Sequence, residues 1–270
     1  MGRGHDRESL TGVLEGAGCI AAREEAEALL AAAAGDSDRL DDLVARRRHG
    51  EPLAWLTGHV EFCGKAVRVF PGVYVPRWQS EPLARLGAAL LPPAGVAVDL
   101  CTGSGAIAMV LAGAAPRAVV VGTEIEPVAA ACARSNGVDV GHGHLDEPLP
   151  VELRGTVDVM TGVLPYVPTD ALQLLPRDVV AFEPRLALDG GEKGIRLLAE
   201  AVRRSVRWLR PGGWLLLELG GEQLDPVGRL MDAVGFGALG VIDDDDGDLR
   251  GICGRLGQRR RSADGLGAAG

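Results

Sequence analysis

The residues best suited to chemistry in this sequence lie in one short stretch, VDLCTGSGAIA, at positions 98–108. An apolar run reaches Asp99, a glycine-rich turn follows, and an apolar helical pattern begins. A strand, a turn and a helix in this order present backbone N–H groups and a helix N-terminus at one edge of a sheet. We expect Gly103 and Gly105 to let the backbone approach a ligand without a clash against Cβ. The stretch therefore predicts a binding site for a nucleotide-like ligand.

Two acidic residues narrow the choice of ligand. The letters GSGAIA also match the dinucleotide fingerprint, so an NAD-dependent enzyme is one alternative. Asp99 argues against it, because a carboxylate at the strand end repels a pyrophosphate and attracts an ammonium group. S-adenosylmethionine carries an ammonium and a sulfonium and no phosphate. Glu124 ends the next apolar run, 19 residues after Gly105, where an acid can accept both hydrogen bonds of a ribose diol. A role for both acids as mere helix caps is the weaker alternative.

A third stretch, TGVLPYVP at 161–168, follows another apolar run. A catalytic loop usually shows a polar group at the end of such a strand. This loop has Val163 and Leu164 there, followed by Pro165 and Tyr166.

The elements that must hold these stretches alternate along the chain. Apolar strand patterns lie at 96–100, 118–123, 157–161 and 214–219, with helical patterns at about 105–114, 127–135 and 194–209. This alternation predicts a parallel, doubly wound α/β sheet. We expect the letters RPGG at 210–213 to end the last helix before the strand WLLLEL. The acidic letters DDDDGD at 243–248 predict a solvated hairpin turn rather than a cation site, because the Glu of a calcium loop is missing.

The first 50 residues have a different pattern. They are rich in Ala and Leu, and Leu40, Leu43 and Val44 recur at helical spacing after Ser37, a suitable N-cap. The arginines at 46–48 fit a helix C-terminus better than a binding patch for an acidic partner. Residues 51–82 contain short β-like runs punctuated by Gly and Pro, which predict a hairpin.

Composition limits the number of domains, the kinds of partner and the cellular location that we expect. A chain of 270 residues with 47% hydrophobic residues supports one full-sized domain and a smaller one. A net charge of −9 argues against general binding to nucleic acid. Five cysteines without a C-x-x-C pair argue against a zinc site and a disulfide framework. No apolar run reaches 18 residues and the start is charged, so we expect a cytoplasmic protein.

Several motifs in order carry a resemblance to a known family. They are GEPLAWLTGHVEFCG, VPRWQSE, DLCTGSGAIA, VDVMTG leading into LPYVP, EPRLALDGGEKG and PGGWLLLELGGEQ, between about residues 50 and 223. The chain resembles the protein-(glutamine-N(5)) methyltransferases, which methylate the glutamine of the Gly-Gly-Gln motif of peptide-chain release factors, and their ribosomal-protein counterparts.

The resemblance implies an architecture, a cofactor and a partner. The fold is a class I, Rossmann-like methyltransferase domain at 91–257, preceded by a small helical domain at 1–50 and a β-hairpin linker at 51–90. A disordered tail is expected at 258–270. The cofactor is S-adenosyl-L-methionine, with no metal. The partner is a release factor or another translation protein, with no direct contact to nucleic acid or membrane.

The resemblance also assigns site residues. The family often has Gly in place of Cys101 and Asp in place of Glu124, and we expect the small thiol and the retained charge to be tolerated. Near the adenine the family often has Gly-Asp, where this chain has Gly143 and His144. The residues implied for the cofactor are Asp99, Cys101, Thr102, Gly103, Ser104 and Gly105 for the methionine end, Glu124 for the ribose, and His144 and Leu145 for the adenine.

The acceptor loop departs from the family motif, which is Asn-Pro-Pro-Tyr. Val163 stands at the Asn and Leu164 at the first Pro, while Pro165 and Tyr166 match. In the family the Asn side chain and a loop carbonyl hold the glutamine amide toward the methyl group. Val163 supplies no such contact, and an unmade buried hydrogen bond costs roughly 1–3 kcal/mol. Three hypotheses follow: a glutamine methyltransferase, a methyltransferase with a changed acceptor, and a cofactor-binding protein with little catalysis.

Overall fold

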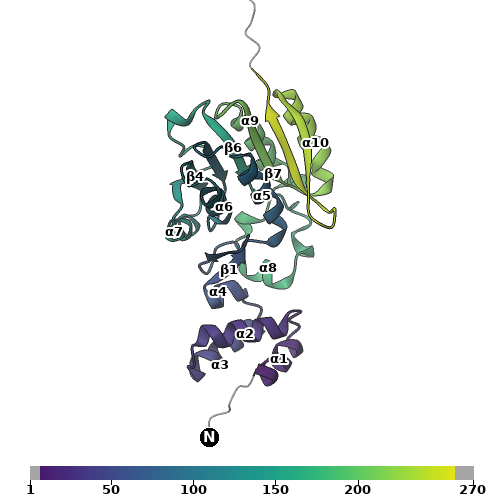
Figure 1. The fold of residues 1–270 in the computed structure, drawn as a ribbon. Coiled ribbons are helices and arrows are strands. Elements are labelled where there is room, and N and C mark those ends of the chain that lie inside the picture. The colour runs from purple at the N-terminus through teal and green to yellow at the C-terminus, as the bar shows by residue number, and fades with distance from the viewer. Residues whose placement is uncertain (1–6, 259–270) are drawn as a thin grey trace, which may run out of the picture.

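A computed structural model of the chain describes residues 7–258 (Figure 1). Its main sheet contains β3 (Val96–Leu100), β4 (Val119–Glu124), β5 (Asp139–His142), β6 (Val157–Gly162), β7 (Leu209–Glu218), β8 (Phe236–Asp243) and β9 (Leu249–Leu256). The order is β5-β4-β3-β6-β7-β9-β8, parallel as far as β7, with β9 antiparallel to both neighbours. The predicted α/β sheet is confirmed. Its strand order reverses beside β3, and ligands of such sheets bind outside the carboxyl ends there.

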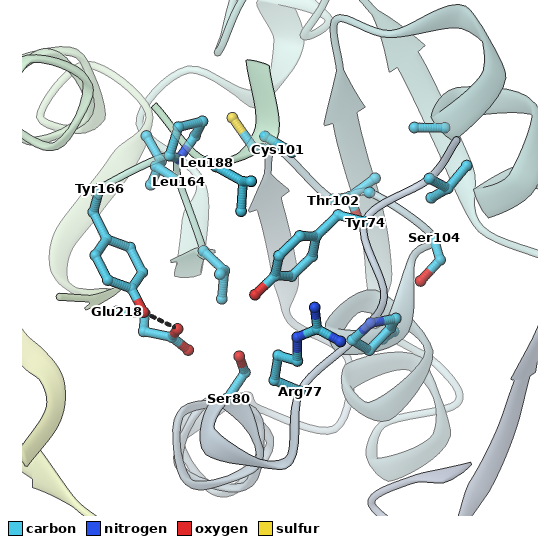
Figure 2. Close-up of a pocket in the computed structure, with 18 of the residues that line it drawn as sticks. Tyr74, Arg77, Ser80, Cys101, Thr102, Ser104, Leu164, Tyr166, Leu188 and Glu218 are labelled. Atoms are coloured by element: carbon cyan, nitrogen blue, oxygen red, sulfur yellow. Dashed lines mark hydrogen bonds between the residues drawn. The ribbon is translucent and has the colours of Figure 1, made fainter. Parts of the chain in front are cut away.

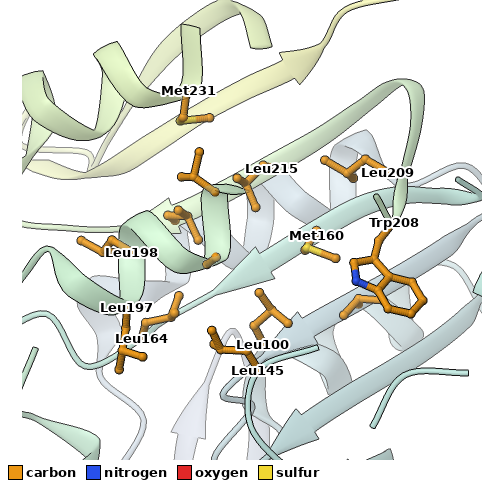
Figure 3. Close-up of a cluster of buried hydrophobic side chains, with 14 of the residues drawn as sticks. Leu100, Leu145, Met160, Leu164, Leu197, Leu198, Trp208, Leu209, Leu215 and Met231 are labelled. Atoms are coloured by element: carbon orange, nitrogen blue, oxygen red, sulfur yellow. The ribbon is translucent and has the colours of Figure 1, made fainter. Parts of the chain in front are cut away.

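Helices cover both faces of the sheet. The helices are α5 (Glu81–Leu90), α6 (Ala106–Ala114), α7 (Pro127–Ser135), α9 (Arg196–Ser205) and α10 (Gly221–Ala233). Alternating residues of the strands point to opposite faces. Ala97, Val159 and Leu216 join the cluster with α5 and α6. Leu100 and Met160 join the cluster with α9 and α10, which Figure 3 shows.

The helices at 105–114 and 127–135 lie where the sequence predicts them. The helix expected at 194–209 is shorter, because α9 ends at Ser205. The segment RPGG at 210–213 does not end that helix; it lies inside β7 and forms an irregularity in the pairing with β6. Val157 pairs with Leu209, but Val159, two residues later, pairs with Trp214. Proline is tolerated at such a bulge, where no ladder hydrogen bond is required.

The N-terminal helices α1 (Arg7–Gly16), α2 (Ala22–Ala33) and α3 (Ser37–Arg48) pack around their own apolar cluster at one end of the molecule (Figure 1). Asp36, rather than the expected Ser37, caps α3, because its carboxylate accepts the N–H of Arg39 at 3.0 Å. Two of the three arginines at 46–48 form intramolecular ion pairs: Arg46 with Glu51, and Arg47 with Glu25. These pairs favour the structural interpretation of the arginines.

A hairpin connects the helices to the sheet. It follows α4 (Leu53–Thr57) and consists of β1 (His59–Phe62) and β2 (Lys65–Arg68), as predicted. The indole of Trp55 donates to the carbonyl of Val73 at 2.9 Å and meets Phe182 edge-on. Phe182 ends α8 (Arg177–Phe182), so this ring contact joins segments distant in sequence. The short 3-10 turns are η1 (Trp78–Ser80), η2 (Val151–Leu153), η3 (Leu172–Leu174), η4 (Arg185–Ala187) and η5 (Glu192–Gly194).

The acidic turn between β8 and β9 is a hairpin turn, as predicted. Asp244 accepts the N–H groups of Asp246 and Asp248 and pairs with Arg250. Among residues 7–258, no group of His, Cys, Asp and Glu is arranged to hold a metal ion. Within the same range, no helix has the length and apolar character needed to cross a membrane. The tail expected at 258–270 lies outside the described residues from 259 onward.

Candidate active site

A cavity of about 490 Å³ opens at the carboxyl ends of β3, β4, β6 and β7 (Figure 2). It brings together residues from the glycine-rich turn, the second strand and the acceptor loop, as the sequence predicts. The predicted residues that line it are Asp99, Cys101, Thr102, Gly103, Ser104, Glu124, Val163, Leu164, Pro165 and Tyr166. Gly105, His144 and Leu145 do not line it.

Asp99 is almost fully buried at the end of β3. Its carboxylate accepts the hydroxyls of Thr102 at 2.5 Å and Thr161 at 2.7 Å. Burial raises the pKa of Asp99 to about 6, and the two hydroxyls partly offset that effect. The groups that shift this pKa include no cation. A buried carboxylate without a counter-charge is suited to attract the ammonium group of a ligand.

The two glycines of the turn have different roles. Gly103 has φ +57°, and a Cβ added there would meet no atom within 4 Å, so its backbone faces open space in the cavity. Gly105 has φ +85°, and a Cβ there would lie 2.8 Å from Val138 and 3.2 Å from Ala133. The open space at Gly103 leaves room for a ligand, and a ligand contact by either glycine stays a prediction. Gly105 instead permits close packing of α6 against the end of α7.

Cys101 adopts the left-handed conformation, with φ +52°. A non-glycine residue in this region costs about 1–2 kcal/mol. The expectation that Cys101 is tolerated rested on the small size of its thiol. The backbone conformation is the stronger constraint, because glycine adopts it without strain and a residue with a Cβ does not.

Glu124 ends β4 and is mostly buried. Its carboxylate accepts three backbone N–H groups, from Gly103, Ile125 and Glu126, at 2.8–2.9 Å. A carboxylate has about four lone-pair sites, so one stays available for a ligand hydroxyl. Burial raises the pKa of Glu124, and the backbone bonds oppose that shift.

Ser104 provides a further polar group beside this turn. It is 2% exposed, and its hydroxyl has no hydrogen-bond partner although it belongs to the cavity lining. A buried hydroxyl of this kind requires a partner to offset its desolvation. Together with the open space at Gly103, it fits a ligand with polar groups at the turn, as S-adenosylmethionine has.

The residues expected near the adenine lie apart from the cavity. The His144 ring nitrogen is 3.1 Å from the Glu200 carboxylate on α9. Leu145 is 3% exposed and packs in the apolar cluster of Figure 3. Their adenine contacts stay a prediction.

The acceptor loop presents no polar side chain at its first two residues. Leu164 is 1% exposed and packs with Leu100 and Leu197 (Figure 3). Val163 is partly buried and packs in the cluster on the other face of the sheet. The polar contacts available from this pair are consequently those of their backbone.

The loop is fixed by residues that the sequence analysis did not single out. The amide of Gln223 donates to the carbonyls of Tyr166 at 2.7 Å and Lys193 at 3.0 Å. A Cβ on Gly194 would lie 1.9 Å from the Tyr166 carbonyl, and one on Gly190 would lie 2.7 Å from its Cα. The motifs DGGEKG and LGGEQ contain these residues, so their match to the family was the available signal.

A carboxylate at the end of β7 was also missed. Glu218 is 3% exposed and accepts the Tyr166 hydroxyl at 2.9 Å. Figure 2 shows the hydroxyls of Tyr74 and Ser80 pointing into the space near it. Its position at the end of the apolar run in WLLLEL repeats the arrangement of Asp99 and Glu124, and that repetition was the signal that could have found it.

Comparisons with known proteins identify the family. No protein-family model matches the chain. A release factor glutamine methyltransferase of Geobacter sulfurreducens is 38% identical over 221 residues, which cover 80% of this chain and 77% of that protein. The chain belongs to the release factor glutamine methyltransferase family. The family makes it an S-adenosylmethionine-dependent methyltransferase.

One similar protein is named for a different methyl acceptor. A 4-amino-L-phenylalanine/4-methylamino-L-phenylalanine methyltransferase of Streptomyces pristinaespiralis is 36% identical over 254 residues, covering 84% of this chain and 86% of that protein. Among solved structures, a methyltransferase from Pyrococcus furiosus is similar at a TM-score of 0.53 and 20% identity, covering 73% of this chain and 91% of that one. This likeness confirms the class I methyltransferase fold.

Proposed function

We propose that the protein transfers the methyl group of S-adenosylmethionine to the side-chain nitrogen of the glutamine in the Gly-Gly-Gln motif of a peptide-chain release factor. Membership of the family carries this proposal. The cavity supports it, because one space joins the acidic strand ends to the loop with Pro165 and Tyr166.

The residues present fit the cofactor. Asp99 would hold the ammonium group, the open backbone at Gly103 and the Ser104 hydroxyl would face the methionine end, and the remaining lone pair of Glu124 would accept a ribose hydroxyl. The bound cofactor supplies an electrophilic methyl group on sulfur. His144 and Leu145 are proposed for the adenine, although neither lines the cavity.

The acceptor loop would position the glutamine amide. The amide nitrogen is a poor nucleophile, because its lone pair is delocalised into the carbonyl. Holding it in line with the methyl group makes the displacement effectively intramolecular, which can supply several kcal/mol of the barrier. The carbonyl of Leu164 would accept an amide N–H, and Tyr166 would form one wall.

The test is methylation of a release factor. The protein is incubated with labelled S-adenosylmethionine and a bacterial release factor, and the Gly-Gly-Gln peptide is examined by mass spectrometry. We expect one added methyl group on the glutamine, and none on a release factor whose motif glutamine is changed to glutamate. If calorimetry shows that the cofactor binds and no methyl transfer occurs, the glutamine proposal fails and a binding role remains.

A second candidate acceptor is an aromatic amine. At the Asn position of the Asn-Pro-Pro-Tyr motif this chain has the apolar Val163. The relative from Streptomyces pristinaespiralis is named for 4-amino-L-phenylalanine, which is an aromatic amine. The free amino acid 4-amino-L-phenylalanine is the probe. Its methylation without methylation of the release factor would favour this candidate.

We further propose a division of the chain into the helical domain at 1–50, the linker at 51–90 and the methyltransferase domain at 91–257. The separate apolar cluster of α1–α3 supports the first boundary. The helical domain would contact the protein substrate, and the cytoplasm, where release factors act, is the proposed location.

A further inference from the structure

The acceptor side of the cavity contains one carboxylate whose hydrogen bonds are incomplete. Glu218 is 3% exposed, and one of its oxygens accepts the Tyr166 hydroxyl at 2.9 Å. The other oxygen, Oε2, is buried and has no hydrogen-bond partner. An unmade hydrogen bond at a buried carboxylate is costly, and such groups in folded proteins call for a functional explanation.

The surroundings of Glu218 fix its position without neutralising it. The Tyr166 hydroxyl donates a hydrogen bond to one oxygen, and the Ser80 hydroxyl and Arg250 lower the pKa of the carboxylate without occupying Oε2. Burial raises the pKa of Glu218 despite these groups. Figure 2 shows the Tyr74 hydroxyl pointing toward the part of the cavity that contains Glu218. The carboxylate is therefore held in place and keeps the capacity to bind a proton.

Glu218 differs from the other acids of the cavity in its location. Asp99 is bonded to the threonines of the cofactor turn, and Glu124 is bonded to backbone N–H groups around the same turn. Glu218 is bonded to Tyr166, a residue of the acceptor loop itself. The opposite part of that loop, at Val163 and Leu164, presents no polar side chain. Glu218 is therefore the carboxylate of the cavity lining that is hydrogen-bonded to Tyr166 of the acceptor loop.

We propose that Glu218 is a catalytic residue that accepts the N–H of the methyl acceptor through Oε2 and takes its proton during transfer. This inference rests on the proposed function of methyl transfer to nitrogen. The nitrogen lone pair forms the bond to the methyl carbon, and the sulfur–carbon bond breaks with its electron pair on sulfur. The nitrogen then releases its proton to the Glu218 carboxylate, which becomes a neutral carboxyl group and returns the proton to water.

The assignment defines a class of acceptor. The nitrogen must carry at least one hydrogen and must be uncharged when it enters, as a primary amide or an aromatic amine is at neutral pH. Hydrogen bonding to a carboxylate increases electron density on an amide nitrogen. Glu218 thus compensates in part for the amide contact that Val163 cannot make.

The test compares the full-length protein with Glu218→Gln, which keeps the shape of the side chain and an oxygen for the Tyr166 hydroxyl. The acceptors are the release factor and 4-amino-L-phenylalanine. General-base catalysis typically contributes about 10²–10⁴-fold, so we expect kcat/KM for the methylated acceptor to fall about 10²-fold or more. Binding of S-adenosylmethionine, measured by calorimetry, should stay unchanged. Glu222→Gln, an exposed glutamate of α10, is the matched control and should behave as wild type.

A pH profile separates catalysis from a structural role. At saturating S-adenosylmethionine, where the titration of Asp99 does not limit cofactor binding, the wild-type kcat/KM for the acceptor should rise with pH as Glu218 loses its proton, above the ordinary range of a glutamate. The profile of Glu218→Gln should lack that rise. The other charged or titratable groups near Glu218 are Tyr74, Tyr166 and Arg250. The two tyrosines stay protonated in this range, because burial raises the pKa of both.

Three outcomes would overturn the inference. If the wild type methylates an acceptor and Glu218→Gln is equally active, the inference fails and the proposed function stands. If Glu218→Gln loses cofactor binding and activity in proportion, its role is structural. If the wild type methylates neither probe and binds neither in the presence of S-adenosylhomocysteine, the proposed function fails and the inference fails with it.

Discussion

Three carboxylates at the carboxyl ends of β3, β4 and β7 carry most of the chemistry of this cavity. Asp99 is solvated by threonine hydroxyls, Glu124 by backbone N–H groups, and Glu218 by Tyr166 on one oxygen only. Each carboxylate can still accept hydrogen bonds, and each suits a different partner. Asp99 suits an ammonium, Glu124 a ribose hydroxyl, and Glu218 an N–H of the acceptor. Residue type alone could not separate these roles, because all three are acids after apolar strands.

The raised pKa of Asp99 predicts how cofactor binding depends on pH. An ammonium beside Asp99 stabilises the carboxylate form and lowers its pKa from about 6, so binding releases a proton wherever the free protein holds one. We expect affinity for S-adenosylmethionine to rise between about pH 5 and 7 and then to level off. In the free protein the same group makes stability fall as pH rises from 3.8 to about 6, since the folded state holds the proton.

Calorimetry in buffers of different ionisation enthalpy measures that proton release directly. Asp99→Asn should bind weakly with no pH dependence over this range. An affinity of the wild type that does not change with pH would contradict the role given to Asp99.

Val163 is the residue at which a single substitution should change the acceptor. Val163→Asn supplies the missing donor and acceptor, and a buried hydrogen bond contributes about 1–3 kcal/mol when it completes a site. We expect kcat/KM for the Gly-Gly-Gln glutamine to rise roughly 10- to 100-fold, since each 1.4 kcal/mol is about tenfold. Val163→Leu, which changes size without polarity, is the control. No gain with Asn would mean that Val163 does not occupy the motif position.

At the scale of elements, the sequence predicts those parts whose signals are local. The strands β3, β4 and β6 and the helices α6 and α7 have clear apolar patterns, and the structure confirms them. β5 was not predicted, because a four-residue strand with the letters DVGH has no clear alternation. The RPGG bulge was misjudged, since Pro and Gly end helices locally but here β6 pairs across them.

The acceptor loop shows why part of the site could not be predicted. Its shape depends on Gln223, Gly190 and Gly194, which follow it by 24 residues or more in the sequence. Such tertiary contacts leave no periodic signal. The family resemblance alone pointed to these segments, and it did not say what they contact.

Gly194 provides a test of this support. It has φ +65°, and a Cβ would lie 1.9 Å from the Tyr166 carbonyl, so Gly194→Ala must displace the acceptor loop. We expect the free energy of unfolding to fall by roughly 2–4 kcal/mol from the clash and the backbone strain together. Methyl transfer should fall more than cofactor binding, because Asp99 and Glu124 lie on other strands.

The matched control is Gly137→Ala, whose φ is +81° and whose added Cβ would meet no atom within 4 Å. It carries the backbone strain alone, about 1–2 kcal/mol. Urea unfolding and calorimetry measure both variants. Equal losses in the two would show that the contact with Tyr166 does not matter.

At the scale of the whole molecule, the cavity is assembled from segments far apart in the chain. Among the lining residues, Tyr74 and Arg77 follow the hairpin, Pro184 follows α8, and Glu218 ends β7. Arg77 lies over the Tyr74 ring at 5.2 Å and forms an ion pair with Glu183, 106 residues later. Because the Glu183 side chain is 1% exposed, this pair fastens the hairpin segment to the wall of the cavity inside the protein.

Removing one partner of this pair should therefore cost much more than removing both. Arg77→Met leaves the Glu183 carboxylate buried without its cation, and we expect a loss of about 3 kcal/mol, the lower end for a broken buried pair because Arg77 is 32% exposed. The double variant Arg77→Met/Glu183→Met replaces the pair with apolar side chains and should recover stability to within about 1 kcal/mol of the wild type.

The loss in Arg77→Met should also depend on pH. Burial already raises the pKa of Glu183 and Arg77 opposes that shift, so without Arg77 the folded protein holds the proton more tightly. Stability should then fall as pH rises above the ordinary glutamate pKa of 4.5, and the double variant should show no such slope. Urea unfolding at several pH values completes the cycle. If the double variant were as unstable as the single one, packing of the Arg77 side chain rather than its charge would hold the hairpin segment against the cavity.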